Sequence, residues 1–248
     1  MAGSNVKKLV VIGAKGRLGS LVTDAARGAG VSVVGVGRGD DLAAALVGAD
    51  AVVDVSTPGS TAKTVAACAA AGVPVLIGTT GLSTDDKDAV DAAARDVAVI
   101  VAANLSPGAH LVALLAGQAA KAMADADVEI VEVHHKKKKD APSGTALMLA
   151  SSVEKARTQL GKRSRIVKAR EGEALRQDGD IGVVAVRGGD VVGEHTVSFF
   201  VDGERVELVH KVSDRGIFAR GALLAARFLA GRPAGRYQMT DVLAAAMG

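Results

Sequence analysis

Two histidines and four lysines, from His134 to Lys139, form the densest group of side chains able to do chemistry in the sequence. An imidazole exchanges protons near neutral pH, and an ammonium group donates a proton or attracts an anion. Neighbours on a strand point to opposite faces, so His134 and His135 are not expected to chelate one metal ion. With no His-x-x-x-His or Cys-x-x-Cys spacing nearby, we predict proton transfer or anion binding and no metal site. For the lysines, a solvated charge cluster remains the alternative.

The residues after this run predict an anion site. Ser143 precedes a helical pattern and is suited to cap it, while Gly144 and Thr145 offer backbone N–H groups, and Thr145 also a hydroxyl, to a carboxylate. The nearby cations favour a small substrate with more than one carboxylate. In such a site His134 and Lys138 are the candidate proton-transfer groups, with Asp140 as a carboxylate that orients Lys138.

The elements around this site follow from periodicity. The stretch from Glu129 to His135 alternates apolar and polar residues as a strand does, and helices are expected at 106–124 and 144–160. We expect a polar surface loop over 162–180. Three further alternating stretches, with an Asp202-Gly203 hairpin signal, predict a mixed or antiparallel sheet over 182–187, 191–201 and 205–211.

The N-terminal part predicts a dinucleotide site. A buried strand at 8–12 leads into a glycine-rich turn and a helix, the arrangement in which backbone N–H groups approach a pyrophosphate. The spacing is Gly-x-x-Gly-x-x-Gly, and a glycine-rich turn without a ligand is the alternative. The predicted contacts in this turn are Gly13, Ala14, Lys15, Gly16, Arg17, Leu18 and Gly19.

Strands and helices then alternate, which predicts a Rossmann-like, doubly wound parallel sheet with ligands at the carboxyl ends of its strands. Strands are expected at 31–36, 51–55, 73–77 and 97–102, and helices at 41–47, 60–71 and 85–95. The further cofactor contacts predicted at strand ends are Gly78, Thr79, Thr80, Ala102, Ala103, Asn104 and Leu105.

The end of the second strand bears on the choice of cofactor. An acid there would bind the ribose 2′-OH of NADH, whereas a cation suits the 2′-phosphate of NADPH. Gly37 stands at the expected position of the acid, Arg38 follows it, and Lys15 and Arg17 lie nearby in the glycine-rich turn. Asp40 is the counter-argument. We therefore expect NADPH to be preferred over NADH.

Length and composition set the outer limits. The 248 residues, 49% apolar and 23% charged, suffice for two modest domains. We expect a dinucleotide-binding domain at 1–105, to which 215–248 returns through helices at 216–229 and 237–247, and an α+β substrate-binding domain at 106–214. A net charge of +3 with five Phe and Tyr residues argues against nucleic-acid binding. A single cysteine, with no visible signal or membrane segment, leads us to expect a cytoplasmic protein without a membrane partner.

The stretch from Glu129 to Ala146, EIVEVHHKKKKDAPSGTA, closely resembles the signature of the dihydrodipicolinate reductase family. The resemblance extends over nearly the whole chain. It is supported by the glycine-rich turn, by Gly78-Thr79-Thr80-Gly81, by Ala103-Asn104-Leu105-Ser106 and by Ser213-Asp214-Arg215 with the helix that follows.

The resemblance implies the reduction of 4-hydroxy-tetrahydrodipicolinate to tetrahydrodipicolinate, in lysine and diaminopimelate biosynthesis, with NADPH or NADH. It implies that His134 is a general acid/base and Lys138 a proton donor, and that His135, Gly144 and Thr145 hold substrate carboxylates. It also implies a homotetramer joined through the sheet of the substrate domain. Gly37 in place of a frequent acid, Leu18 in place of Met and Leu105 in place of Phe depart from the family pattern.

Two other functions fit the motifs less fully. A Rossmann oxidoreductase acting on another cyclic imine or amino-acid-derived dicarboxylate would use the same groups, so the choice between these substrates requires an assay. A dinucleotide-binding protein without catalysis would have no reason to hold His134, Lys138 and the Ser143-Gly144-Thr145 turn together.

Overall fold

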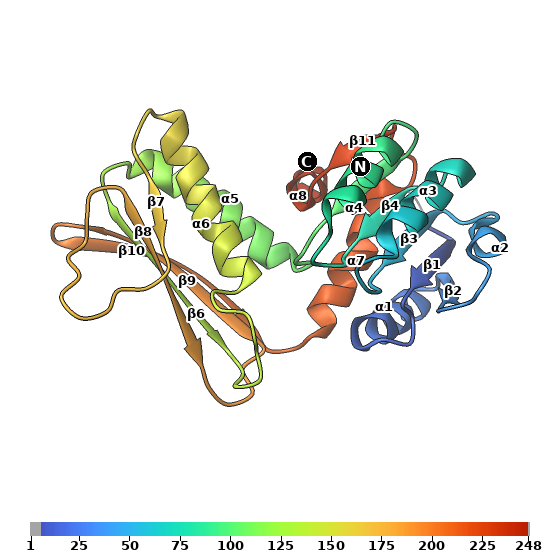
Figure 1. Cartoon of the computed structure of the whole chain (residues 1–248), viewed down its shortest axis with the longest axis horizontal. Helices are drawn as coiled ribbons and strands as arrows, with labels where there is room; N and C mark the ends of the chain where they lie inside the picture. Colours follow the sequence, from blue (N-terminus) through green and yellow to red (C-terminus); the bar gives the residue numbers. More distant parts are fainter. Residues whose placement is uncertain (1–5, 248) are drawn as a thin grey trace. The chain divides into compact units, whose positions relative to one another are not determined.

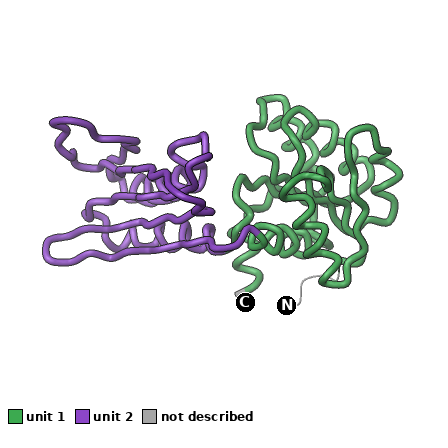
Figure 2. The backbone as a smooth tube through the Cα atoms, turned by 90° about the horizontal axis from the view of Figure 1, so that it is seen from below, with its two compact units in different colours: residues 1–107, 216–248 green, residues 108–215 purple. Residues whose placement is uncertain are grey.

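The computed structural model describes residues 6–247, which divide into two compact units. Unit 1 comprises 1–107 and 216–248, and unit 2 comprises 108–215 (Figure 2). These divisions lie close to the boundaries expected at 105/106 and 214/215. The roles assigned to the two units remain proposals.

Unit 1 is built on a parallel sheet with strand order β11-β5-β4-β3-β1-β2 (Figure 1). Its strands are β1 (Lys8–Ile12), β2 (Ser32–Val36), β3 (Ala51–Asp54), β4 (Val75–Ile77), β5 (Ala98–Val101) and β11 (Gly235–Tyr237). Its helices are α1 (Arg17–Gly28), α2 (Leu42–Leu46), α3 (Thr61–Ala71), α4 (Thr84–Ala93), α7 (Gly216–Leu229) and α8 (Met239–Met247). This confirms the doubly wound fold.

Both faces of this sheet are buried because alternate side chains of each strand pack on different helices. Leu9 and Val11 of β1 pack with α1, α7 and α8 in one apolar cluster. Val10 and Ile12 pack with α2, α3 and α4 in the other. The continuous apolar run of β1 therefore has a physical cause.

Unit 2 contains a mixed sheet with strand order β10-β9-β6-β8-β7. Its strands are β6 (Asp127–His134), β7 (Arg165–Val167), β8 (Asp180–Arg187), β9 (Gly193–Val201) and β10 (Glu204–Val212). The central strand β6 runs parallel to β8 and antiparallel to β9, which forms the predicted hairpin with β10.

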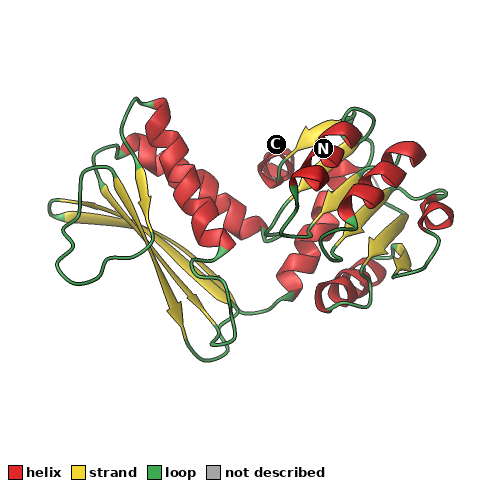
Figure 3. Cartoon of the chain, in the orientation of Figure 1, coloured by secondary structure: helices red, strands yellow, loops and turns green. Residues whose placement is uncertain are grey.

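Two helices, α5 (Pro107–Ala122) and α6 (Gly144–Gln159), cover one face of this sheet (Figure 3). The inward side chains of β6, Val128 and Ile130, are fully buried against them. Glu132 and His134 continue the same inward row, so the period of the strand carries polar groups into the layer between sheet and helices.

Two expectations from sequence were wrong in detail. The stretch 162–180 is not entirely loop, because it contains β7, which pairs with β8. The segment expected as a helix over 237–247 is preceded by β11, which adds a parallel edge strand beside β5. Both strands have three residues, too few to show an alternating pattern.

Candidate functional site

His134, the last residue of β6, lies in a buried hydrogen-bonded network. Its Nδ1 bonds the Oε2 of Glu132, two residues earlier on the same face of the strand. The Glu132 side chain is fully buried and that of His134 is 10% exposed. A buried carboxylate is expected only where donors compensate for its lost hydration.

Arg187 and the start of α6 supply these donors. Arg187, which pairs with His134 in the register of β8 on β6, donates from Nη1 and Nη2 to the two carboxylate oxygens of Glu132, each at 2.8 Å. The backbone N–H of Ser143 donates to Glu132 Oε1 at 3.0 Å. The Glu132 carboxylate therefore accepts hydrogen bonds from three residues: His134, Arg187 and Ser143.

The N-terminus of α6 is capped by Ser143, as predicted. Its Oγ accepts from the backbone N–H of Ala146 at 3.1 Å and also hydrogen-bonds Nε2 of His195 at 3.1 Å. Gly144 and Thr145 form the first turn of the helix, where the helix dipole favours an anion. This end of α6 can therefore hold a carboxylate.

Lys138 differs from the other lysines of its run. Lys136, Lys137 and Lys139 are exposed, whereas the Lys138 side chain is 20% exposed and its Nζ lies 2.9 Å from Asp140 Oδ1. The predicted pairing of Lys138 with Asp140 is therefore present. The loop that carries them is held to the network because Arg187 also donates to the backbone carbonyl of Asp140 at 2.7 Å.

His135 faces a second cation. Its Nε2 accepts from Arg215 Nη2 at 3.3 Å, and its backbone N–H donates to the carbonyl of Val191 at 2.7 Å. His135 and Arg215 both belong to unit 2. An imidazole and a guanidinium side by side form a suitable partner for a carboxylate.

Burial and charge set the protonation states in this network. Burial lowers the pKa of His134 below its ordinary value, although the Glu132 carboxylate acts in the opposite direction. For Glu132, burial raises the pKa, but hydrogen bonds from Arg187, His134 and Ser143 lower it more, so the carboxyl stays ionised near neutral pH. Burial, with the charge of His134, lowers the pKa of His195 to about 4.

The network contains three residues that sequence reasoning missed: Glu132, Arg187 and His195. Arg187 and His195 reach the site only through strand register, since β8 pairs Arg187 with His134 and β9 pairs His195 with Glu132. Register across strands distant in sequence cannot be inferred from one chain. Glu132 did carry a signal, because an acid two residues before a histidine on a strand shares its face.

The predicted cofactor residues of unit 1 lie at the carboxyl ends of parallel strands, as expected. The glycine-rich turn joins β1 to α1, and Gly16, at the N-cap, offers no side-chain acceptor to the first turn of the helix. A Cβ on Gly13, whose φ is +80°, would lie 2.9 Å from the Cα of Ser56 after β3. A Cβ on Gly19 would collide with the backbone of Gly13. The turn is thus a close-packed backbone cradle that fits a pyrophosphate.

The other predicted contacts follow β2, β4 and β5. Arg38 is exposed after β2, and Thr80 is exposed after β4. Thr79 is buried, with its Oγ1 3.3 Å from Asp54 Oδ1. Leu105 is also buried, against Gly78, and forms part of the core. After β5, Ala102 is buried, Ala103 is exposed, and Asn104 Oδ1 accepts from the backbone N–H of Ser106 at 2.7 Å.

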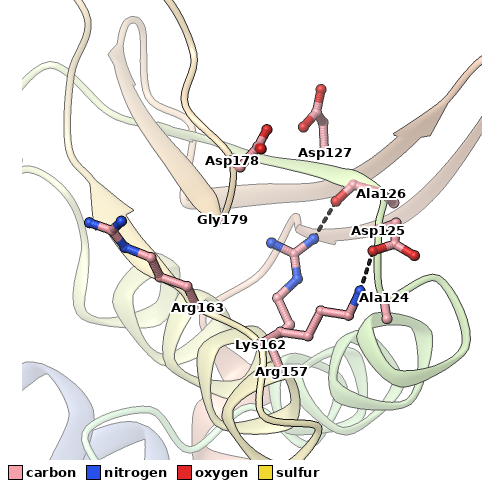
Figure 4. Close-up of a pocket in the computed structure, with 9 residues that line it drawn as sticks. All are labelled: Ala124, Asp125, Ala126, Asp127, Arg157, Lys162, Arg163, Asp178 and Gly179. Carbon is pink, nitrogen blue, oxygen red and sulfur yellow. Dashed lines mark hydrogen bonds and ion pairs between the residues drawn. The ribbon is translucent and has the colours of Figure 1, made fainter.

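A charged pocket lies at the other end of unit 2 (Figure 4). It includes Asp127, the first residue of β6, so it is about 23 Å from His134 along a strand that rises ~3.3 Å per residue. Its charges are engaged locally: Arg157 donates to the carbonyl of Ala126, and Lys162 pairs with Asp125. It is separate from the His134 network.

The described residues contain neither a cluster of metal ligands nor a helix that could span a membrane. Within residues 6–247, no three His, Cys, Asp or Glu side chains gather as a metal site would require. In the same range, no helix combines the length and apolarity needed to span a membrane.

Comparison with known proteins identifies the family. Residues 7–105 match the family described as "Dihydrodipicolinate reductase, N-terminus" and residues 108–243 match "Dihydrodipicolinate reductase, C-terminus". A 4-hydroxy-tetrahydrodipicolinate reductase of Anaeromyxobacter is 46% identical over 95% of this chain and 88% of its own. The enzyme of that name from Psychrobacter arcticus is 40% identical over 98% of both chains.

Solved structures agree on the fold. A dipicolinate-bound dihydrodipicolinate reductase from Paenisporosarcina superposes with a TM-score of 0.76 at 22% identity, over 94% of this chain and 98% of its own. GenD2 from gentamicin A biosynthesis, in complex with NAD, gives a TM-score of 0.54 at 17% identity, over 98% of this chain and 92% of its own. With both family halves matched in order and the same two-sheet fold, this chain belongs to the dihydrodipicolinate reductase family and is a nicotinamide-dependent oxidoreductase.

Proposed function

We propose that this chain catalyses the reduction of 4-hydroxy-tetrahydrodipicolinate to tetrahydrodipicolinate in lysine and diaminopimelate biosynthesis. The substrate loses water and gains a hydride and a proton, while NADPH or NADH is oxidised. The observation that carries the proposal is the gathering, at one end of the unit 2 sheet, of His134, Lys138 and the N-terminus of α6. Proton-transfer groups and a carboxylate cradle belong together in such a reaction.

The substrate carboxylates are assigned to two places in unit 2. One is the first turn of α6, where Gly144 and Thr145 supply N–H groups and Ser143 orders the turn. The other is the pair formed by His135 and Arg215. Two anion sites suit a dicarboxylate, and the exposed lysines next to His135 add a field that attracts it. The dipicolinate bound to the Paenisporosarcina relative is consistent with this assignment.

Lys138 and His134 are assigned to proton transfer. The Lys138 ammonium, held beside Asp140, donates the proton that balances hydride addition. His134 assists by exchanging protons with the reacting centre. Its lowered pKa keeps the imidazole neutral near pH 7, so that one ring nitrogen has a lone pair available.

The cofactor is assigned to the strand ends of unit 1. A bound NADPH or NADH supplies the hydride. The first turn of α1 and the glycine-rich turn would bind its pyrophosphate. The proposed contacts are Gly13, Ala14, Lys15, Gly16, Arg17, Leu18, Gly19, Arg38, Gly78, Thr79, Thr80, Ala102, Ala103, Asn104 and Leu105.

NADPH is proposed as the preferred cofactor. Lys15, Arg17 and Arg38 are exposed, as a 2′-phosphate site requires. The acid that argues for NADH, Asp40, accepts from the backbone N–H of Gly37 at 2.7 Å and thus closes its own turn. Fluorescence titration should give a lower Kd for NADPH than for NADH, and Arg38→Gln should narrow the difference. A lower Kd for NADH would refute the preference.

The test of the reaction is oxidation of NADPH and NADH with enzymatically generated 4-hydroxy-tetrahydrodipicolinate. We expect turnover that depends on both substrates, and a much slower rate with a cyclic imine that bears a single carboxylate. Cofactor binding without turnover of the dicarboxylate would exclude the proposed activity.

A further inference from the structure

Glu132 occupies a position that proton transfer by His134 and Lys138 does not by itself explain. It is fully buried, and its carboxylate accepts hydrogen bonds from His134, from both terminal nitrogens of Arg187 and from the Ser143 N–H. Every partner is a donor. An ionised carboxylate, which only accepts, is the one acidic side chain of this length that satisfies all of them at once.

The bond to Glu132 has a consequence for the tautomer of His134. Because the carboxylate only accepts, the proton of the neutral imidazole must reside on Nδ1, and the lone pair must reside on Nε2. The residue at position 193 of β9 bears on Nε2. It is a glycine, and a Cβ there would lie 3.0 Å from His134 Nε2 and crowd it.

Glu132 also ties His134 to the other assigned groups. Through Arg187, which bonds the carbonyl of Asp140, it is linked to the loop that carries Lys138. Through the Ser143 N–H it is linked to the first turn of α6. One side chain thus connects the proton-transfer groups with a proposed carboxylate site.

A structural ion pair with Arg187 is the simpler explanation for Glu132. An ion pair would be satisfied by the guanidinium alone, at any position opposite Arg187 on the sheet. It does not account for the bond to His134 Nδ1 or for the small residue that leaves Nε2 uncrowded.

We propose that Glu132 is a positioning residue that fixes the Nδ1–H tautomer of His134 and so presents Nε2 as the proton acceptor. It also holds the Lys138 loop and the N-terminus of α6 in fixed positions relative to His134. The catalytic part of this proposal rests on the proposed function. The tautomer part does not, because it concerns the protein without substrate.

The decisive variant is Glu132→Gln. A glutamine has one acceptor oxygen for the several donors around it. Arg187 and the Ser143 N–H compete for that oxygen, which leaves the amide NH₂ facing His134 Nδ1. The imidazole would then accept at Nδ1 and carry its proton on Nε2. The ring would keep its place and lose the lone pair required at Nε2, so kcat should fall roughly 10²- to 10⁴-fold.

The test combines ¹⁵N NMR of histidine-labelled protein with kinetics. The chain has five histidines, and a His134→Gln spectrum assigns the resonance in question. We expect the Nδ1–H tautomer in the wild type and the Nε2–H tautomer in Glu132→Gln, with an unchanged Kd for NADPH. The matched control is Glu207→Gln on β10, an exposed glutamate outside the network, which should retain both the wild-type tautomer and kcat.

Each outcome decides between the explanations. An Nε2–H tautomer in the wild type overturns the proposal even if Glu132→Gln does not fold. An unchanged tautomer in a folded Glu132→Gln variant, whatever its stability, reduces Glu132 to an ion-pair partner of Arg187. If the wild type shows the Nδ1–H tautomer but does not reduce the dicarboxylate, the proposed function fails and the positioning of His134 stands.

Discussion

At the scale of single residues, the four lysines after His135 separate by burial and by partner. Lys138 is partly buried and pairs with Asp140, whereas Lys136, Lys137 and Lys139 are exposed. An ammonium group with a fixed position can serve as a proton donor in a defined geometry. Exposed ammonium groups contribute mainly to the electrostatic field, which salt screens.

Replacement of Lys138 tests this division. Lys138→Ala removes the donor without altering unit 1, so kcat should fall by about 10²-fold or more while the Kd of NADPH stays near that of the wild type. Lys137→Ala is the matched control and should change mainly KM, more at low salt than at high salt. Steady-state kinetics with a fluorescence titration measures both, and wild-type turnover by Lys138→Ala would remove it from the mechanism.

The buried histidine on β9 makes a prediction about pH. His195 has a pKa of about 4 in the folded chain against about 6.5 when unfolded, so between these values the unfolded state binds the additional proton. Stability should therefore be fully present above pH 6.5 and decline as the pH falls toward 4, by about 3 kcal/mol in all for this one group.

His195→Gln isolates this effect. Glutamine retains an amide group for the bond to Ser143 but does not titrate. Urea unfolding at several pH values should show a shallower decline between pH 6.5 and pH 4.5 in the variant than in the wild type. Equal declines would mean that the imidazole of His195 is not held neutral by the fold.

At the scale of elements, the start of α6 does two things at once. Ser143 caps the helix and contacts His195, and its backbone N–H contacts Glu132. Ser83 caps α4 of unit 1 in a similar way, with Asp86 completing a capping box. These two serines allow the structural role of a cap to be separated from its role in the site.

Ser143→Ala and Ser83→Ala should each destabilise the chain by about 1 kcal/mol, the usual cost of a lost N-cap. Only Ser143→Ala should also raise KM for the dicarboxylate, because only α6 lies at the proposed substrate site. Urea midpoints and steady-state kinetics compare the two variants. A similar rise in KM for Ser83→Ala would attribute the effect to general loosening.

The sequence predicted the long helices and strands but not the shortest strands. Long periodic stretches such as β6 and α6 were predicted because each contains several repeats of its apolar pattern. β7 and β11, with three residues each, form through pairing with a neighbour already in place. For the same reason, the local motif at Ser143 could be predicted, whereas the approach of Arg187 to Glu132 depends on sheet register.

At the scale of the whole molecule, the outer face of the unit 2 sheet has no helix covering it among the described residues. Strand register places Val184, Val131, Thr196 and Val209 in one row across this face, and Val186 lies on the same face of β8 as Val184. The four valine side chains are 39–49% exposed. A row of exposed apolar side chains on a sheet is the kind of surface that subunits bury. It supports the proposal that the chain forms a homotetramer through this sheet.

A charge on this face should break that assembly. Val184→Lys places an ammonium group in this row, beside Val131, where burial against a second copy would leave it unpaired and cost several kcal/mol. Val47→Lys is the matched control, because Val47 is 74% exposed at the end of α2 in unit 1 and is not part of the unit 2 sheet. Sedimentation equilibrium should show a tetramer for the wild type and for Val47→Lys, and smaller species for Val184→Lys. A monomeric wild type would reject the homotetramer, and a tetrameric Val184→Lys variant would place the subunit contact on another surface.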